Sequence, residues 1–279
     1  MGGGIGPRAF GGGVPADPVP VAGAELLTNG DFAAWTGGNP DGWNIAGESG
    51  SDPAVSEVAG GARFYSSASN DLILFQTIPY VGWLRIAATY VAAVGQPIAL
   101  RDGSIIYSNF ASTQPITALW SNAWMGIYGL SPVDITYSLA SAVPLTLSSI
   151  ISTRACASPD CDISAAVTRT AGTQAGLCAR LDSASSPANF IIAYENGAGL
   201  VKVDKCVSGT YTNVIDAAIT YVAGRVLRLV CSGNDVSCYY NGVQVGTTVT
   251  VADAGIVSNK NHGKFSTYAS NTLANYVAA

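Results

Sequence analysis

Side chains able to do acid–base or nucleophilic chemistry are scarce in this chain. His262 is the only histidine, so a Ser–His–Asp arrangement would have no other base to draw on. Glycosidases use two closely placed carboxylates, whereas most of the acidic residues here fall in turns, as Asp41, Asp102 and Asp235 do. The four glutamates are Glu25, Glu48, Glu57 and Glu195. The sequence therefore predicts a protein that is not an enzyme.

Cysteines are the other reactive groups, and all six lie in the second half of the chain, at Cys156, Cys161, Cys178, Cys206, Cys231 and Cys238. An even number confined to one region predicts disulfides, in an oxidising setting or a thermophile. Cys156 and Cys161 flank a short turn, and Cys231 and Cys238 flank a hairpin tip, so these local pairs are preferred. Cys178–Cys206 then follows by elimination. Zinc is the rival, but no Cys-x-x-Cys pair occurs.

The composition excludes two classes of partner. The net charge is −5, and no basic cluster is present that could neutralise phosphates, so no nucleic acid is expected. The longest apolar runs fall short of the roughly 20 residues that a membrane helix needs, and residues 1–8 lack the pattern of a secretory signal. Only 11% of the residues are charged, against about 25% in typical soluble domains. Such a surface suits a particle or filament subunit covered by neighbours, or a secreted β-rich domain.

The elements that must position these residues are predicted to be strands. The length favours two domains, at residues 24–150 and 151–279, and no capped helix is expected. The first domain should hold strands at 62–66, 72–77, 83–92, 98–101, 105–110, 123–128, 135–139 and 145–150. The second should hold strands at 163–168, 175–182, 190–195, 200–206, 226–231 and 237–240. Asn196-Gly197 and Asn241-Gly242 are strong hairpin-turn signals.

Residues 1–23 form a Gly/Pro-rich arm that cannot bury enough surface to fold alone. Its prolines favour an extended path. It is either a disordered tail or an arm that lies along a neighbouring subunit, with Ile5 and Phe10 as anchors. Glycine-rich starts of this kind resemble those of phage tail and head-fibre proteins, which favours the docking arm.

The start of the first domain carries a more specific resemblance. Glu25-Leu-Leu-Thr-Asn-Gly-Asp-Phe32 is followed by Trp35 and by Asn39-Pro-Asp-Gly-Trp43. Leu26 and Leu27 would start the first strand, and Asn29-Gly30 supplies a turn that tolerates positive φ. This spacing resembles the opening of the carbohydrate-binding-module-like jelly rolls found in glycan-active enzymes and in phage virion proteins. The resemblance covers residues 24–150.

The second domain resembles a laminin-G-like or concanavalin-like sandwich. The resemblance rests on Gly176–Asp182, Leu200–Lys205, Gly224–Val230 and, above all, Tyr239-Tyr-Asn-Gly-Val-Gln-Val-Gly246. The chain is therefore predicted to be all-β, with two tandem β-sandwich (jelly-roll) domains after a flexible N-terminal arm. The Glu-x-Asp-x-x-Glu-like strand of concanavalin-type glucanases is absent, which counts against a glycan depolymerase.

The resemblance implies two kinds of ligand site. Related sandwiches often hold a structural calcium ion, for which Asp31 and Asp134 are the candidate ligands; the alternative, which is favoured, is that Asp31 caps its own turn. No other cofactor is expected. Glycan recognition would need exposed aromatic rings, and the candidates are Trp120 and Trp124 in the first domain and Tyr194 and Tyr240 in the second. Core packing is the competing role for each tryptophan.

Taken together, these features predict a non-enzymatic structural protein of a bacteriophage virion, as a capsid decoration or a tail or fibre component. Its partners would be other copies of itself, other virion proteins and host surface glycans. The alternatives are a secreted bacterial carbohydrate-binding protein and an extracellular filament subunit with a donated strand.

Overall fold

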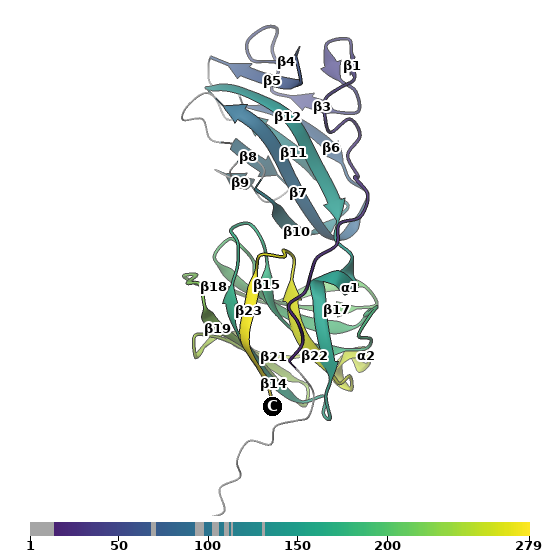
Figure 1. Ribbon diagram of the computed structural model, residues 1–279, viewed down its shortest axis with the longest axis vertical. Coiled ribbons are helices and arrows are strands. Elements are labelled where there is room, and N and C mark those ends of the chain that lie inside the picture. The colour runs from purple at the N-terminus through teal and green to yellow at the C-terminus, as the bar shows by residue number, and fades with distance from the viewer. Residues whose placement is uncertain are drawn as a thin grey trace, which may run out of the picture. The chain divides into compact units, whose positions relative to one another are not determined.

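A computed structural model describes residues 14–67, 71–92, 98–101, 106–108, 112, 114–129 and 132–279. These residues are almost all in strands and the turns between them, so the predicted all-β sandwich architecture is confirmed. The chain divides into two compact units, and both are visible in Figure 1. We call Ala22–Pro144 the first domain, and Leu145–Ala279 together with residues 14–21 the second domain.

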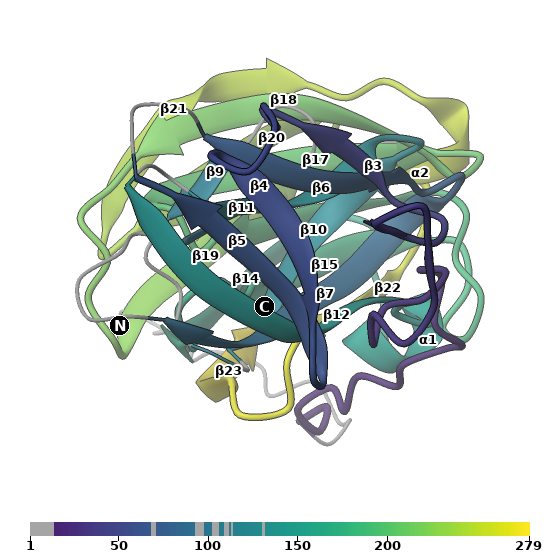
Figure 2. The ribbon, with the colours of Figure 1, turned by 90° about the horizontal axis from the view of Figure 1, so that it is seen from above.

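The first domain consists of two five-stranded antiparallel sheets and a short hairpin. One sheet has the strand order β10 (Ile116–Ser121), β7 (Val81–Ala92), β12 (Val133–Pro144), β5 (Gly61–Ser66), β4 (Ala54–Val58). The other has the order β3 (Asn44–Ala46), β6 (Leu72–Thr77), β11 (Trp124–Gly129), β8 (Ile98–Arg101), β9 (Ile106–Ser108). The hairpin pairs β1 (Trp35–Thr36) with β2 (Asn39–Pro40). The strands β5, β7 and β12 run alongside one another in Figure 2.

The opening motif of the first domain forms a tight turn, and this corrects the strand expected at Leu26 and Leu27. Asn29 and Phe32 both have positive φ, of 52° and 55°. The turn buries the Phe32 ring against Trp43, with 5.3 Å between the ring centroids. The Trp43 indole N–H donates to the carbonyl oxygen of Asn29. The aromatic residues of the motif therefore anchor the core rather than a binding surface.

The second domain is a sandwich of a six-stranded and a five-stranded antiparallel sheet. The six-stranded sheet has the order β13 (Ile151–Ala155), β22 (Asn261–Ser266), β15 (Ala175–Leu181), β16 (Phe190–Glu195), β17 (Leu200–Val207), β18 (Thr210–Ala218). The five-stranded sheet has the order β21 (Val243–Thr250), β20 (Asp235–Tyr240), β19 (Arg225–Ser232), β14 (Cys161–Thr168), β23 (Thr272–Ala278). Asn241-Gly242 makes the predicted tight turn between β20 and β21, with φ of 50° and 83°.

Residues 14–21 lie against the rest of the second domain, beside β22 and β23 (Figure 1). Pro15 and Pro18 are buried there. The Asp17 carboxylate pairs with the Lys264 ammonium group at 2.8 Å and accepts from the backbone N–H of Leu273 at 3.4 Å. This part of the predicted arm therefore completes a domain of its own chain. The predicted anchors Ile5 and Phe10 lie outside the described residues.

The structure corrects one expected strand and adds two helical turns without side-chain caps. The segment 145–150, expected as a strand, contains the one-turn helix α1 (Leu147–Ile150), and a second turn, α2 (Ala254–Val257), follows β21. Several strands were also missed: β4, β10, β13, β18 and β21. The burial pattern of β18 and β21 explains two of these omissions, because most of their residues are exposed and supply no apolar alternation.

Candidate functional site: two arginine–aspartate–tyrosine clusters

The aromatic residues predicted as sugar platforms lie mostly inside the protein. Trp120 is 1% exposed, Tyr194 is 4% exposed and Tyr240 is 8% exposed. Their polar atoms bind the protein itself: the Trp120 N–H donates to the Ile78 carbonyl, and the Tyr194 hydroxyl donates to the Asp204 carboxylate. Trp124 is half-buried and packs against Phe75. The first three residues therefore cannot serve as platforms, because a ligand must reach the ring face.

The two predicted calcium ligands have other partners. Asp134 forms a two-point ion pair with Arg63, with both N–O distances at 2.8 Å. The Asp31 carboxylate accepts a hydrogen bond from the backbone N–H of Ala33 at 3.3 Å, as expected of a turn cap. Within the described residues no group of three or more His, Cys, Asp or Glu side chains could hold a metal ion. Asp31 and Asp134 therefore do not belong to a group of this kind in the described part of the chain.

The cysteines differ from the predicted pairing, and the structure holds all six as thiols. Cys231 and Cys238 share a face of neighbouring strands, but Cys231 lies opposite Val236 and Cys238 opposite Leu229, so the two are offset along the strands. Cys231 lies instead directly opposite Cys161. Cys178 and Cys206 donate to different backbone carbonyls, those of Lys264 and Ala188. The predicted disulfides are not shown, and in this part of the chain strand register, rather than sequence distance, brings cysteines together.

His262 is fully buried and its two ring nitrogens are both engaged. Nδ1 accepts from the backbone N–H of Arg180 at 3.1 Å, which leaves the proton on Nε2, 3.1 Å from the carbonyl oxygen of Ser158. Burial lowers the pKa of this imidazole. The neutral ring therefore holds backbone segments together.

An exposed polar cluster occupies one face of the first domain. Arg63 on β5 binds Asp134 on β12, and its guanidinium group lies 5.1 Å from the centre of the Tyr65 ring. The hydrogen bonds from Arg63 lower the pKa of Asp134, so the pair stays charged at neutral pH. Arg63 and Tyr65 border a depression of about 440 Å³, whose wall also includes Glu48 and Glu57. We call Arg63, Asp134 and Tyr65 the first-domain cluster.

The second domain carries the same three residue types on its five-stranded sheet. Arg228 on β19 binds Asp162 on β14 through Nε at 2.7 Å and Nη2 at 2.6 Å. Its guanidinium group lies 4.9 Å from the centre of the Tyr239 ring on β20. The hydrogen bonds that Arg228 donates to Asp162 raise the pKa of Arg228 further. We call Arg228, Asp162 and Tyr239 the second-domain cluster.

The two clusters share the geometry and the exposure of the arginine–aspartate pair, but the tyrosines are placed differently. Tyr65 lies on the same strand as Arg63, whereas Tyr239 lies opposite Arg228 on a third strand. In each, the aspartate lies diagonally across the strand pair from the arginine, because Tyr65 lies opposite Asp134 and Ser164 lies opposite Arg228. The exposed fractions of the paired side chains lie between 41% and 44% in both domains. Within the described residues no hydrogen bond is made to Nη1 of either arginine. Each cluster thus presents fixed donors and acceptors beside an aromatic ring.

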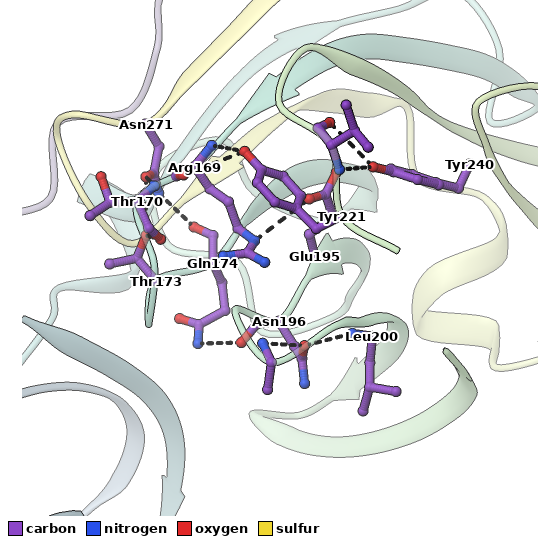
Figure 3. A network of polar contacts seen from close by, with 12 residues as sticks. Arg169, Thr170, Thr173, Gln174, Glu195, Asn196, Leu200, Tyr221, Tyr240 and Asn271 are labelled. Carbon is purple, nitrogen blue, oxygen red and sulfur yellow. Dashed lines mark hydrogen bonds and ion pairs between the residues drawn. The ribbon is translucent and has the colours of Figure 1, made fainter. Parts of the chain in front are cut away.

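A third arginine–carboxylate pair lies inside the second domain, at the centre of the network in Figure 3. Arg169 Nε is 3.6 Å from Glu195 Oε2, and the two side chains are 6% and 1% exposed. The Arg169 guanidinium stacks 4.1 Å from the centre of the Tyr221 ring. Burial raises the pKa of Glu195 to about 7, against the opposing effect of Arg169. No ligand can reach this pair from solvent.

The remaining side chains of the network tie loops together. The Asn271 side chain accepts from the backbone N–H of Thr170 and donates to the Gln174 carbonyl (Figure 3). The Tyr240 hydroxyl binds the backbone N–H of Val222 at 2.9 Å. Tyr240, predicted as a sugar platform, is therefore an anchor for the 219–224 connection.

One sequence signal could have found part of the second-domain cluster. Val236, Cys238 and Tyr240 alternate along β20 and are all buried, so Tyr239 between them must point outward. No comparable signal identifies the partners of the two arginines, because they lie 71 and 66 residues away along the chain.

Comparison with known proteins returns likenesses of structure only. No protein-family model matches the chain, and no curated protein does. A carbohydrate-binding module, CBM66, from Bacillus subtilis aligns with 85% of this chain and 94% of its own, at 10% identity and a TM-score of 0.36. Sheep galectin-11 in complex with glycerol aligns with 46% of this chain and 96% of its own, at 8% identity and a TM-score of 0.37.

The kappa-carrageenase of Pseudoalteromonas carrageenovora aligns with 98% of this chain and 87% of its own, at 10% identity and a TM-score of 0.31. These scores are too low to carry an argument about function.

The described residues contain no helix with the length and apolar character needed to cross a membrane. Among the contacts of the described residues, the two exposed clusters are the ones best suited to bind a ligand.

Proposed function

We propose that the protein is a non-enzymatic glycan-binding protein, and that the first-domain and second-domain clusters are its binding sites. The observation that carries the proposal is that the same exposed pair, with a tyrosine ring beside its arginine, occurs on both domains. Each has a two-point arginine–aspartate pair beside a tyrosine ring, with the paired side chains more than 40% exposed.

The chemistry of the clusters fits a sugar. Neighbouring hydroxyl groups of a pyranose can accept from the guanidinium N–H groups and donate to the second lone pairs of the carboxylate. The tyrosine adds apolar area for the C–H face of the ring. Because each arginine is neutralised by its own aspartate, and the whole chain carries a net charge of −5, neutral glycans are favoured over acidic ones.

Two sites on one chain make weak single-site affinity useful. A polysaccharide that engages both clusters can gain a factor of about 10² or more over one site. This avidity would suit a polymer or a cell surface as the ligand, more than a free monosaccharide.

The test is binding of the full chain to a panel of neutral and acidic polysaccharides, followed by titration with the best ligand. Arg63→Ala and Arg228→Ala are each expected to weaken binding by roughly tenfold, and the double variant by more. Lys202→Ala is the matched control, because Lys202 also forms a surface ion pair, with Asp216, but lacks the arrangement of the two clusters.

Loss of binding in Lys202→Ala to the same extent as in Arg228→Ala would contradict the assignment, as would retention of full affinity in the double variant. A wild-type chain that binds none of the polysaccharides would overturn the proposed function.

Location in a bacteriophage virion, partner virion proteins and self-association stay predictions from the sequence. They rest in part on the predicted arm at residues 1–23, of which residues 1–13 lie outside the described residues. A glycan-binding role is compatible with such a particle and equally with a secreted bacterial protein, and electron microscopy of the native source material distinguishes the two settings.

A further inference from the structure

Two cysteines face each other across neighbouring strands of the second domain. Cys161 on β14 and Cys231 on β19 are direct partners in the antiparallel register, and they are 6% and 1% exposed. Directly opposite residues of an antiparallel pair have Cα atoms about 4.5–5.5 Å apart and side chains on the same face. A disulfide needs Cα atoms about 4.4–6.8 Å apart. The backbone therefore already meets the main geometric condition for a bond between these two residues.

The surroundings of the pair also favour reaction. Cys161 borders a cavity of about 30 Å³ whose wall includes the half-buried Cys156 and His262. This volume is of the size that one water molecule needs, so the sulfur is not sealed off by close packing on that side. The two facing thiols affect each other's titration, so that the pKa of Cys161 is raised and that of Cys231 is lowered.

We propose that Cys161 and Cys231 form a redox pair, which a low-molecular-weight disulfide converts into a cross-strand disulfide. With oxidised glutathione as the oxidant, the thiolate of Cys161, the more exposed of the two cysteines, attacks one glutathione sulfur and releases the first glutathione thiolate. The Cys231 thiolate then attacks the Cys161 sulfur in the mixed disulfide and releases the second. The two protein thiols lose two electrons and two protons, and one glutathione disulfide becomes two glutathione thiols.

The bond would join the two strands that carry the second-domain cluster. Asp162 and Arg228, which form its ion pair, lie on β14 and β19 close to the cysteines and on the opposite, exposed face of the sheet. Oxidation would therefore hold these strands in register directly behind the ion pair. The inference itself does not depend on glycan binding, because it rests on the positions of the two cysteines.

The test uses the full chain with Cys156→Ser, which removes the more exposed thiol that could take up glutathione on its own. After incubation with oxidised glutathione, the count of reactive thiols in denaturant should fall from five to three, since the wild-type chain has six cysteines. Tryptic peptide 155–169 should appear linked to peptide 229–260 in the non-reduced digest. Cleavage before Asp235 then separates Cys231 from Cys238 and identifies the bonded residue.

Further substitution of Cys231 by Ala should abolish the linked peptide, and Cys238→Ala should leave it in place. Oxidation should also raise the melting temperature on the order of 10 °C, because the bond closes a long loop in the unfolded chain. Five thiols remaining after oxidation, or a link that joins Cys161 to Cys238, would overturn the proposal. The digest of the Cys156→Ser chain decides between these outcomes even if a core substitution prevents folding.

Discussion

Two of the arginine–carboxylate pairs in the second domain lie in opposite environments. Arg228 and Asp162 lie on an open sheet face, with side chains 42% and 41% exposed. Arg169 and Glu195 lie between the sheets, with side chains 6% and 1% exposed. The exposed pair is joined by two short hydrogen bonds, whereas the buried pair is separated by 3.6 Å, and neither Glu195 oxygen has a hydrogen-bond partner among the described residues.

The comparison separates a structural role from a binding role. Water screens the exposed pair, so it contributes little to stability and can exchange water for ligand hydroxyl groups. The buried pair has lost its hydration, so each charge depends on the other for compensation. Exposure, more than residue type, therefore decides which of the two can function as a site.

The largest effect on stability is expected for Arg169→Met. It would leave Glu195 buried without a cation, and we expect the free energy of unfolding of the second domain to fall by about 3–5 kcal/mol. The loss should shrink at low pH, where Glu195 takes up a proton. Calorimetry of the full chain measures it. Arg225→Met is the control, because Arg225 is exposed and its side chain donates to Asn241 rather than to a carboxylate. Equal effects of the two substitutions would contradict the distinction.

Replacing both members of the buried pair should restore much of the free energy of unfolding that Arg169→Met loses. In Arg169→Met with Glu195→Leu no buried charge remains, and apolar replacements of a buried pair are often neutral or stabilising. We expect the double variant to recover at least half of the stability lost by Arg169→Met, as measured in a double-mutant cycle. A double variant less stable than Arg169→Met alone would show that the two charges are not coupled.

The pH dependence of stability gives a smaller effect that is specific to the buried pair. The pKa of Glu195 is raised from 4.5 to about 7 in the folded state, so between these values the folded chain binds more protons than the unfolded chain. The contribution of Glu195 to the free energy of unfolding is therefore fully present below about pH 4.5 and is lost as the pH rises through about 7. Glu195→Gln should flatten this dependence in urea titrations at pH 5, 6 and 7. The exposed Glu57→Gln should leave it unchanged.

The smallest stability effects are expected at the exposed clusters. Arg63→Ala and Arg228→Ala should each lower the free energy of unfolding by less than about 1 kcal/mol, because exposed pairs are screened and cost side-chain entropy. The same variants should strongly weaken glycan binding, so stability and binding separate. A loss above 2 kcal/mol in either variant would place its arginine with the structural pair rather than with a ligand site.

Local sequence patterns predicted much of the strand content but little of the candidate site. Runs such as Leu72–Thr77 and Phe190–Glu195 matched the strands β6 and β16 in full. The tryptophans and tyrosines were harder to place, because an aromatic residue is common both in a core and on a binding face. Trp120 and Tyr240 lie in the core. The more exposed ring of the second-domain cluster belongs to Tyr239, one residue away from Tyr240.

The sequence by itself determined the all-β architecture, the tight turn at Asn241-Gly242 and the scarcity of catalytic groups, since these follow from composition and from patterns a few residues long. Only the tertiary structure decided which cysteines face each other and which arginine pairs with which carboxylate. Cys161 meets Cys231, and Arg63 meets Asp134, through the register of strands far apart in the chain. That register is set by the packing of whole sheets, where a shift of one residue would turn every side chain to the other face.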